Sequence, residues 1–253
     1  MPDDRIPSEL GLRLAQVQAI SFDGDGTLWD FESAMLQGLA TVLDELQRRR
    51  PGPAAEALTV GALQALRDTA AAEMPGASLE EIRLESMHRA VRAASEGDPE
   101  EGALAQALYA LYMSERYAAL RLCADARTAL EALAPRYPLA VISNGNTDVV
   151  RAGLRIPFAA VVFAADVGYA KPDPRIFFRA CRLLDCPDEA LLHVGDTLET
   201  DVAGAQAAGV LAVWLRRGGR RAGGASPGAG TRPPDLTIRS LDELVQLMDR
   251  CGR

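Results

Sequence analysis

Short apolar segments alternate with helical segments through most of the chain. Several of the apolar segments are rich in Val, Ile and Leu and lead directly into Asp, Ser or Gly and then into an amphipathic stretch. This order is typical of a parallel sheet, because parallel strands need a crossover connection, usually a helix. The predicted strands lie at 17–22, 139–142, 161–164, 191–194, 210–215 and 236–238, and the predicted helices at 125–133, 148–154, 174–184 and 241–248.

One long segment departs from this alternation. Residues 32–117, between the first two predicted strands, are rich in Ala, Leu, Glu and Arg at helical spacing and show hardly any strand pattern. A crossover needs only about a dozen residues, so this segment is predicted to be an inserted helical domain. Pro and Gly at 51–53, 75–76 and 97–99 divide it into four predicted helices.

These patterns predict an α/β protein. Its core is a Rossmann-like, doubly wound parallel sheet formed by residues 1–31 and 118–253, and its cap is the α-helical insertion 32–117. The Gly- and Arg-rich segment 218–234 is predicted to be a loop, and the sequence gives it no role.

Composition and charge limit the binding partners and the cellular compartment that the protein is expected to have. Hydrophobic residues make up 48% and charged residues 25% of the chain, the balance of an ordinary globular protein. The net charge of -8 opposes binding to nucleic acid or to an anionic membrane, and the arginines at 216, 217, 220 and 221 are interpreted as a solvated cluster. The start of the chain lacks the pattern of a secretory signal, so the protein is expected to be cytoplasmic. The four cysteines form no CxxC pair and are interpreted as reduced and mostly buried.

Two aspartates follow the first predicted strand directly. Asp23 and Asp25 lie on a glycine-containing turn at the carboxyl edge of the sheet, where open α/β sheets bind ligands. Carboxylates this close repel each other unless a cation lies between them or one keeps its proton. Taken alone, the motif could also be a turn that only ends the strand.

Other polar residues follow the second and fourth predicted strands. Ser143 and Asn144 offer a hydroxyl and main-chain donors that suit a phosphate oxygen. Asp196 and Asp201 follow the fourth strand. The carboxyl ends of parallel strands meet at one edge, so Asp196 is expected to point into the same crevice as Asp23.

Lys171 stands out against the composition of the chain. It is the single lysine among 27 lysines and arginines, and it lies in a proline-rich turn before a predicted helix. A chain that uses arginine everywhere else has kept lysine where a compact ammonium is needed in place of a planar guanidinium. Chance retention is the alternative.

Together, these residues resemble the haloacid dehalogenase-like hydrolase superfamily. Its four motifs occur in order as DGDGTLWD, SNG, the lysine of KPDP, and GDTLETD. The resemblance extends from about residue 16 to residue 214, and it is to the branch whose helical cap is inserted between the first two motifs. Gly24 departs from the pattern, because the family often has a larger residue there; a looser loop with unchanged chemistry is expected.

This resemblance implies a magnesium-dependent phosphatase, a hydrolase of phosphoric monoesters. Asp23 would attack phosphorus to form an aspartyl-phosphate, and Asp25 would protonate the leaving oxygen and then activate water. Mg²⁺ would be held by Asp23, Asp196 and the main-chain carbonyl of Asp25.

The resemblance also assigns residues to the phosphoryl group. Ser143, the amide of Asn144 and Lys171 would hold its oxygens. Gly24 and Thr27 would complete the substrate-binding loop. Asp201 would support the site by orienting Lys171 or a metal-bound water.

Two other functions are compatible with this family. A 2-haloacid dehalogenase uses the same nucleophile, but those enzymes usually lack the second aspartate, because a halide leaves without a proton. A non-catalytic binding module would be expected to have lost a charged motif residue, and all are present here. A phosphonate hydrolase of the capped type is disfavoured, because it would need a cap lysine.

The substrate is left open by the sequence. A capped site favours small soluble phosphate esters of the nucleotide, sugar phosphate or phosphoglycolate type, and no motif marks the cap residues that choose among them. The last predicted cap helix carries three tyrosines, interpreted first as core residues and second as substrate contacts: Tyr109, Tyr112 and Tyr117, beside Met113 and Arg116. The oligomeric state is not predicted.

Overall fold

The structure is a computed structural model that describes residues 8–95, 97, 99–217 and 232–251. The chain forms two compact units, which we call the core unit (Met1–Asp30 and Leu122–Arg253) and the inserted unit (Phe31–Arg121). The predicted loop 218–234 lies outside the described residues except for 232–234, and so do the arginines at 220 and 221.

A parallel sheet of six strands forms the centre of the core unit, with the order β3-β2-β1-β4-β5-β6. Successive strands are added on both sides of β1, which makes the sheet doubly wound. Phe22 of β1 is level with Val141 of β2 and Val194 of β4, so the residues after these strands emerge side by side. The strands are β1 (Ala19–Phe22), β2 (Leu139–Ser143), β3 (Ala160–Phe163), β4 (Leu191–Gly195), β5 (Leu211–Leu215) and β6 (Leu236–Ile238).

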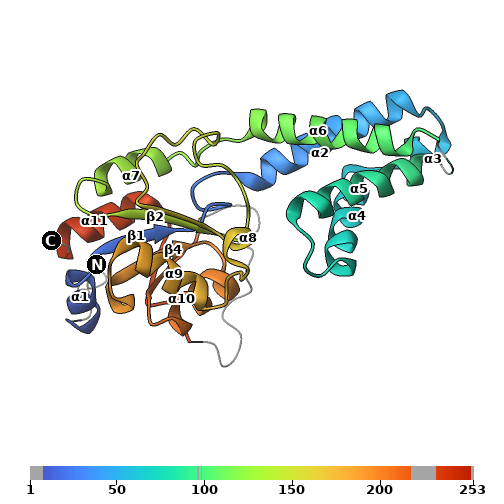
Figure 1. The fold of residues 1–253 in the computed structure, drawn as a ribbon. Coiled ribbons are helices and arrows are strands. Elements are labelled where there is room, and N and C mark those ends of the chain that lie inside the picture. The colour runs from blue at the N-terminus through green and yellow to red at the C-terminus, as the bar shows by residue number, and fades with distance from the viewer. Residues whose placement is uncertain (1–7, 96, 98, 218–231, 252–253) are drawn as a thin grey trace. The chain divides into compact units, whose positions relative to one another are not determined.

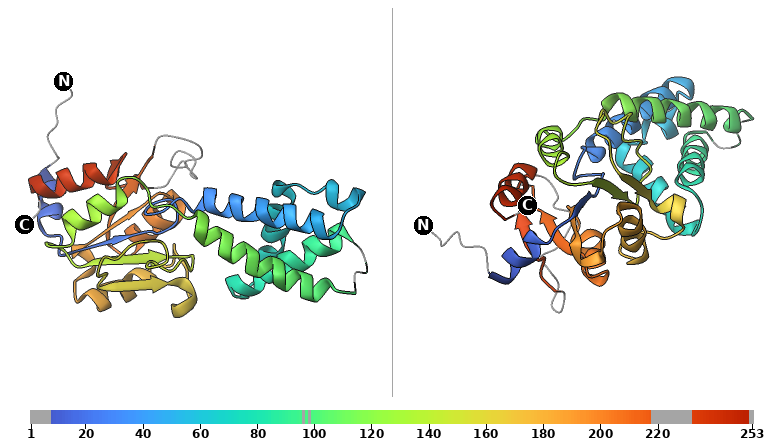
Figure 2. Two further views of the ribbon diagram at one scale, coloured as in Figure 1. Left: turned by 90° about the horizontal axis from the view of Figure 1, so that it is seen from above. Right: turned by 60° about the vertical axis from the view of Figure 1, so that its left-hand side comes forward.

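Helices cover both faces of this sheet. In Figures 1 and 2, α1, α7 and α11 lie on one face and α9 and α10 on the other. Two short turns of helix, η1 and the π-helical η2, flank β4. The bounds are α1 (Ser8–Ala15), α7 (Ala126–Leu133), α8 (Ala164–Val167), α9 (Arg175–Leu184), η1 (Asp188–Ala190), η2 (Leu198–Val202), α10 (Ala203–Ala207) and α11 (Leu241–Cys251).

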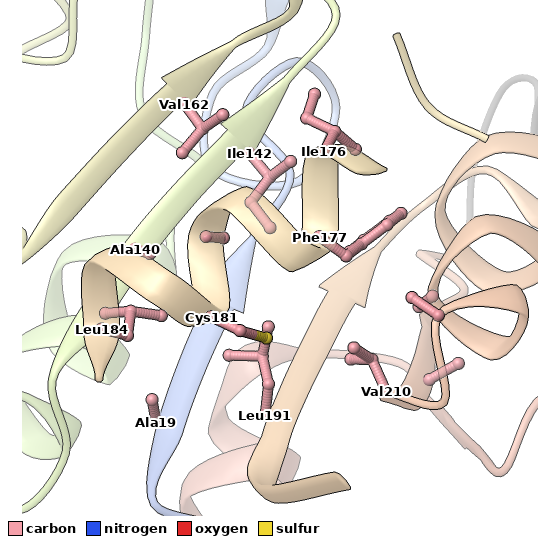
Figure 3. Packing of buried hydrophobic residues seen from close by; sticks show 14 of the residues in the cluster. Ala19, Ala140, Ile142, Val162, Ile176, Phe177, Cys181, Leu184, Leu191 and Val210 are labelled. Atoms are coloured by element: carbon pink, nitrogen blue, oxygen red, sulfur yellow. The ribbon is translucent and has the colours of Figure 1, made fainter. Parts of the chain in front are cut away.

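The apolar stripe of α9 forms much of the core beneath one face. Phe177 and Cys181 of α9 are fully or nearly fully buried and pack in one cluster with Ile142 of β2 and Leu191 of β4, as Figure 3 shows. Strands buried on both faces read as continuous apolar runs, which explains why their positions are visible in the sequence.

The described residues of the inserted unit form helices and the turns between them, and the unit has its own hydrophobic core. Thr59 caps α4, and Ser78 forms a reciprocal capping box with Glu81 at the start of α5. Its helices are α2 (Phe31–Arg49), α3 (Pro53–Glu56), α4 (Val60–Glu73), α5 (Leu79–Ala94) and α6 (Glu101–Ala119). The predicted α/β fold with a helical insertion after the first strand is confirmed.

Several local predictions were wrong. Residues 148–154 form turns and no helix. Asp148 begins a single helical turn, in which its carbonyl accepts from the Ala152 amide at 2.9 Å, and Gly153 ends this turn because its φ of +90° is left-handed. The second predicted cap helix is divided into α3 and α4. Of the four free cysteines only Cys181 is buried; the other three are half-buried.

None of the described helices is long and apolar enough to cross a membrane. The expected cytoplasmic location stays a prediction.

Candidate active site

One small cavity at the carboxyl edge of the sheet gathers most of the residues singled out in the sequence. Its volume is about 160 Å³, well below the ~300–1,000 Å³ usual for a small-molecule site, so it suits the charged end of a ligand. Gly24 and Thr27 are not among its lining residues. It is lined by Asp23, Asp25, Ser143, Asn144, Gly145, Lys171, Asp196, Thr197, Thr200 and Asp201.

Asp23 is fixed at the end of β1. Its amide donates to the carbonyl of Val194 at 2.8 Å, which continues the β1–β4 pairing by one residue. Its carboxylate is buried and accepts a hydrogen bond from Lys171 Nζ at 2.6 Å. Burial raises the pKa of Asp23 well above its usual value; the positive charge of Lys171 opposes this, and the negative charges of Asp201 and Asp25 add to it.

Lys171 joins two carboxylates. Its Nζ lies 2.6 Å from an oxygen of Asp23 and 2.6 Å from an oxygen of Asp201, and the residue is only 4% exposed. Burial by itself lowers the pKa of Lys171, but the two carboxylates outweigh this and raise it above the ordinary value, so the ammonium is charged.

The Asn144 side chain holds the main chain of Lys171 in place. Its Nδ2 donates to the Lys171 carbonyl at 2.9 Å, and its Oδ1 accepts from the Lys171 amide at 2.7 Å. The sequence suggested only the main-chain amide of Asn144 as a functional group. The side chain therefore adds a link between the SNG and KPDP motifs that the sequence did not reveal.

Three carboxylates could share a cation. Ligand oxygens of Asp23, Asp196 and Asp201 all lie within 4.8 Å of one another. Burial raises the pKa of Asp196 to about 6, with Asp201 adding to the effect. Burial would also raise the pKa of Asp201, but the charge of Lys171 and the hydrogen bond from His193 hold it below its usual value.

The donor set fits a hard divalent cation. With Asp25, four carboxylates face the cavity, and Lys171 is the one cation among its lining residues, so negative charge is in excess. An all-oxygen set of this kind suits Mg²⁺. The side chain of Asp25 is not part of the cluster, so its predicted contact through the main-chain carbonyl stays a prediction.

The indole of Trp29 positions Asp25, and the sequence gave no signal for this. Its Nε1 donates to Asp25 Oδ1 at 2.5 Å, and the Thr147 hydroxyl donates to the same oxygen at 3.4 Å. The Trp29 ring is fully buried over Gly24, where an added Cβ would lie 2.4 Å from ring atom Cζ2. The expectation of a looser loop at Gly24 was therefore wrong: the indole fills the space that a larger residue would take.

His193 lies in the core and is connected to the site. Its Nδ1 lies 2.9 Å from Ser21 Oγ and its Nε2 3.5 Å from Asp201 Oδ1. Burial lowers the pKa of His193 and favours the neutral ring. Because a carboxylate only accepts, we assign the proton to Nε2, and the Ser21 hydroxyl then donates to Nδ1.

The comparisons with known proteins agree on one family. A model of haloacid dehalogenase-like hydrolases matches residues 17–209. N-acylneuraminate-9-phosphatase of Mus musculus is 27% identical over 241 residues, which cover 93% of this chain and 95% of the mouse protein. The 5-amino-6-(5-phospho-D-ribitylamino)uracil phosphatase of Escherichia coli (strain K12) is 31% identical over 205 residues, which cover 80% and 85% of the two chains.

A solved structure is similar over nearly the whole chain. The crystal structure of 2-haloacid dehalogenase from Pseudomonas syringae pv. Tomato DC3000 superposes with a TM-score of 0.74 and 32% sequence identity. The match covers 92% of this chain and 99% of that chain. The names of these similar proteins thus refer to two reactions, hydrolysis of a phosphate ester and removal of a halide.

Proposed function

The chain belongs to the haloacid dehalogenase-like hydrolase family, and within it we propose a magnesium-dependent phosphatase that hydrolyses a small phosphomonoester through an aspartyl-phosphate on Asp23. The observation that carries this proposal is the placement of Asp25. Its carboxylate lines the same cavity as Asp23 and is held there by the Trp29 and Thr147 donors. A fixed second carboxylate is what a reaction with a poor leaving group needs, because the departing oxygen has to be protonated.

In the first step, a carboxylate oxygen of Asp23 attacks phosphorus and the bond between phosphorus and the ester oxygen breaks. Asp25 donates its proton to that oxygen, and the alcohol leaves. In the second step, Asp25 takes a proton from water, the water oxygen attacks the phosphorus of the aspartyl-phosphate, and Asp23 leaves as a free carboxylate. Inorganic phosphate is the product, and both aspartates return to their starting states.

The remaining lining residues stabilise the phosphoryl group. Lys171 and the Ser143 hydroxyl supply positive charge and a donor to its oxygens, and Asp201 orients Lys171 through the 2.6 Å ion pair. Mg²⁺, held by Asp23 and Asp196, would neutralise the repulsion between the phosphoryl oxygens and these carboxylates. The names of the mouse and Escherichia coli relatives support a small phosphorylated metabolite as substrate.

A 2-haloacid dehalogenase is the second candidate, favoured by the similarity to the Pseudomonas syringae structure. That reaction would use Asp23 on carbon and would release halide without a proton donor. Asp25 would then have no role in the reaction, although two hydrogen bonds hold its carboxylate in the cavity. This observation favours the phosphatase.

The two candidates are separated by one set of assays. Purified protein is incubated with a panel of small phosphomonoesters and with 2-chloropropionate, each with Mg²⁺ and with chelator, and phosphate and chloride release are measured. We expect phosphate release that chelator abolishes, and no chloride release. Asp23→Asn should remove activity to below detection, because uncatalysed ester hydrolysis is extremely slow, whereas Asp249→Asn, at an exposed site on α11, should not change it.

Chloride release that depends on Asp23 and is unaffected by chelator would show that the protein is a dehalogenase and not a phosphatase. Full phosphatase activity in Asp23→Asn would rule out the covalent route. Circular dichroism of both variants confirms that the fold is retained.

A further inference from the structure

Two of the four cysteines lie together in the core unit, where α9 ends. Cys181 is in the last turn of the helix, is 3% exposed and belongs to the core cluster shown in Figure 3. Cys186 follows the helix, is half-buried and packs against the same cluster. Both are free thiols, and neither takes part in the reaction proposed above.

The main chain holds these two residues next to each other. Asp185 is left-handed, with a φ of 52° and a ψ of 45°, and it turns the chain back over the end of α9. The Cys181 carbonyl then accepts hydrogen bonds from the amide of Asp185 and, at 3.1 Å, from the amide of Cys186. A closure of this kind is a Schellman motif, in which the side chains at its two ends commonly touch. Here both ends are cysteines.

The two thiols are hydrogen-bonded to one another, with opposite effects on each. This bond raises the pKa of Cys181 and burial raises it further, so Cys181 keeps its proton and is the donor. The same bond lowers the pKa of Cys186, the acceptor, although burial and the charges of Asp188 and Asp185 oppose it. Because the thiolate is the reactive form of cysteine, Cys186 is the nucleophile of the pair.

The pair is accessible to a small reactant. Both thiols line a surface cavity of about 560 Å³, together with Phe178, Arg182 and other residues around the end of α9. This volume lies within the ~300–1,000 Å³ usual for a small-molecule site. A metal ion fits less well, because a zinc site takes at least three protein ligands and the one group of three candidate ligands among the described residues is in the active-site cavity.

We propose that Cys181 and Cys186 are a site of reversible disulfide formation, with a small-molecule disulfide such as oxidised glutathione as the oxidant. The Cys186 thiolate attacks one sulfur of the oxidant, whose S–S bond breaks, and a first thiolate leaves. The Cys181 sulfur then attacks the Cys186 sulfur of the mixed disulfide, and the proton of Cys181 passes to the second departing thiol. Two electrons move from the protein thiols to the oxidant, and excess thiol reverses both steps.

The disulfide joins the end of α9 to the segment that leads through η1 into the amino end of β4. The active-site cavity lies beyond the opposite, carboxyl end of that strand. The bond restricts the unfolded chain in a region where the native chain is already closed by a hydrogen bond. We therefore expect the oxidised protein to melt above the reduced protein by roughly 5 °C.

The first measurement locates the bond by peptide mass spectrometry. Reduced protein is treated with oxidised glutathione, the remaining thiols are blocked, and the protein is digested with trypsin without reductant. Trypsin cuts after Arg179 and Arg182, so the disulfide appears as peptide 180–182 linked to a peptide that begins at residue 183. We expect this linked product in wild type and in the control Cys251→Ser, and we expect dithiothreitol to release both peptides.

The second measurement separates the two steps of the reaction. Cys181→Ala removes the second thiol, so one glutathionyl group should remain on Cys186 of this variant, whereas wild type should retain none there. Cys186→Ser should leave Cys181 unmodified, because this thiol is buried and protonated. Thermal scans before and after oxidation then measure the stabilisation, which wild type should show and Cys186→Ser should lack.

The proposal is overturned if oxidised glutathione gives no linked product in wild type, or if glutathione remains on Cys186 of wild type as it does in Cys181→Ala. A bond from Cys186 to Cys123 or Cys251 in place of Cys181 would also overturn it. A linked product with no rise in melting temperature would support the disulfide and contradict its stabilising effect.

Discussion

Trp29 connects the packing of the loop after β1 to the placement of Asp25. The indole lies on Gly24, and its N–H reaches the carboxylate of Asp25, the next residue of that loop. An added methyl group at residue 24 would meet the ring, so the small residue and the large one have to occur together. We infer that Trp29 is a positioning residue for the proposed acid and base.

The variant Trp29→Phe tests this positioning role when its activity is compared on substrates with poor and good leaving groups. The variant keeps an aromatic ring and removes the donor to Asp25, so proton transfer to a poor leaving group should suffer most. We expect kcat/KM for an alkyl phosphate to fall by at least about 10-fold, and kcat/KM for p-nitrophenyl phosphate, whose leaving group needs no proton, to change by less than about threefold. A purely structural role would lower both values equally, and that result would contradict the positioning role.

The sequence revealed the charged residues of the site and missed the groups that hold them. Asp23 and Asp196 are visible because a charged residue directly after an apolar strand indicates a function, and Lys171 is visible because it is the single lysine of the chain. The bonds from Trp29 to Asp25 and from the Asn144 side chain to Lys171 depend on loop geometry, which residue types alone do not determine.

At the level of elements, α10 lies very close to the loop that carries Lys171. A Cβ added at Gly204 would lie 2.9 Å from Pro172 Cα and 2.9 Å from the Phe177 ring. Because Pro172 directly follows Lys171, the contact between α10 and this loop also determines where the ammonium lies. Backbone atoms cannot move aside as a flexible side chain can.

Gly204→Ala should therefore separate α10 from this loop. We expect a loss of about 1–3 kcal/mol in the free energy of unfolding, measured by denaturant titration, together with reduced kcat. Gly102→Ala is the control, because no atom lies within 4 Å of the added Cβ on α6 and alanine favours a helix by up to about 1 kcal/mol over glycine. Equal or higher stability of Gly204→Ala would show that the close approach has room to relax.

The elements themselves were predictable to different degrees. The strands were found because both faces of a covered parallel sheet are apolar. The helix expected at 148–154 was wrong because the helical turn that begins at Asp148 ends already at Gly153, whose φ of +90° is left-handed. The division between α3 and α4 depends on the Thr59 cap, a signal that the sequence contains but that helical periodicity obscured.

At the scale of the whole molecule, the excess of buried negative charge couples stability to pH and to metal. In the metal-free protein burial raises the pKa of Asp196 to about 6, well above the usual value for aspartate, and the pKa of Asp23 is raised as well. Between the pKa that each carboxyl group has in the unfolded chain and its raised pKa in the folded protein, the native state therefore binds more protons than the unfolded chain. This contribution to stability is complete below the unfolded pKa and is lost as the pH rises through the folded pKa.

Mg²⁺ should act in the opposite direction, because it binds the ionised carboxylates. We expect the rise in melting temperature on adding Mg²⁺ to be small near about pH 5 and to grow towards about pH 7.5, as protons cease to compete. Thermal scans with Mg²⁺ and with chelator across this range measure it, and Asp196→Asn should abolish the Mg²⁺ effect throughout. A shift of the same size at both ends of the range would contradict the role of these carboxylates as ligands.

The chain leaves the core unit and returns to it at the same place. Trp29 and Leu122 form an antiparallel bridge, and the Cys123 amide donates to the Leu28 carbonyl at 2.9 Å. The core therefore holds the two ends of the insertion side by side, as if a short hairpin joined them. A recombination event that exchanged the DNA between codons 30 and 122 would keep both ends paired and leave the aspartates and Lys171 in place. The inserted unit of a protein built this way can thus be exchanged while the residues that we propose for catalysis are kept.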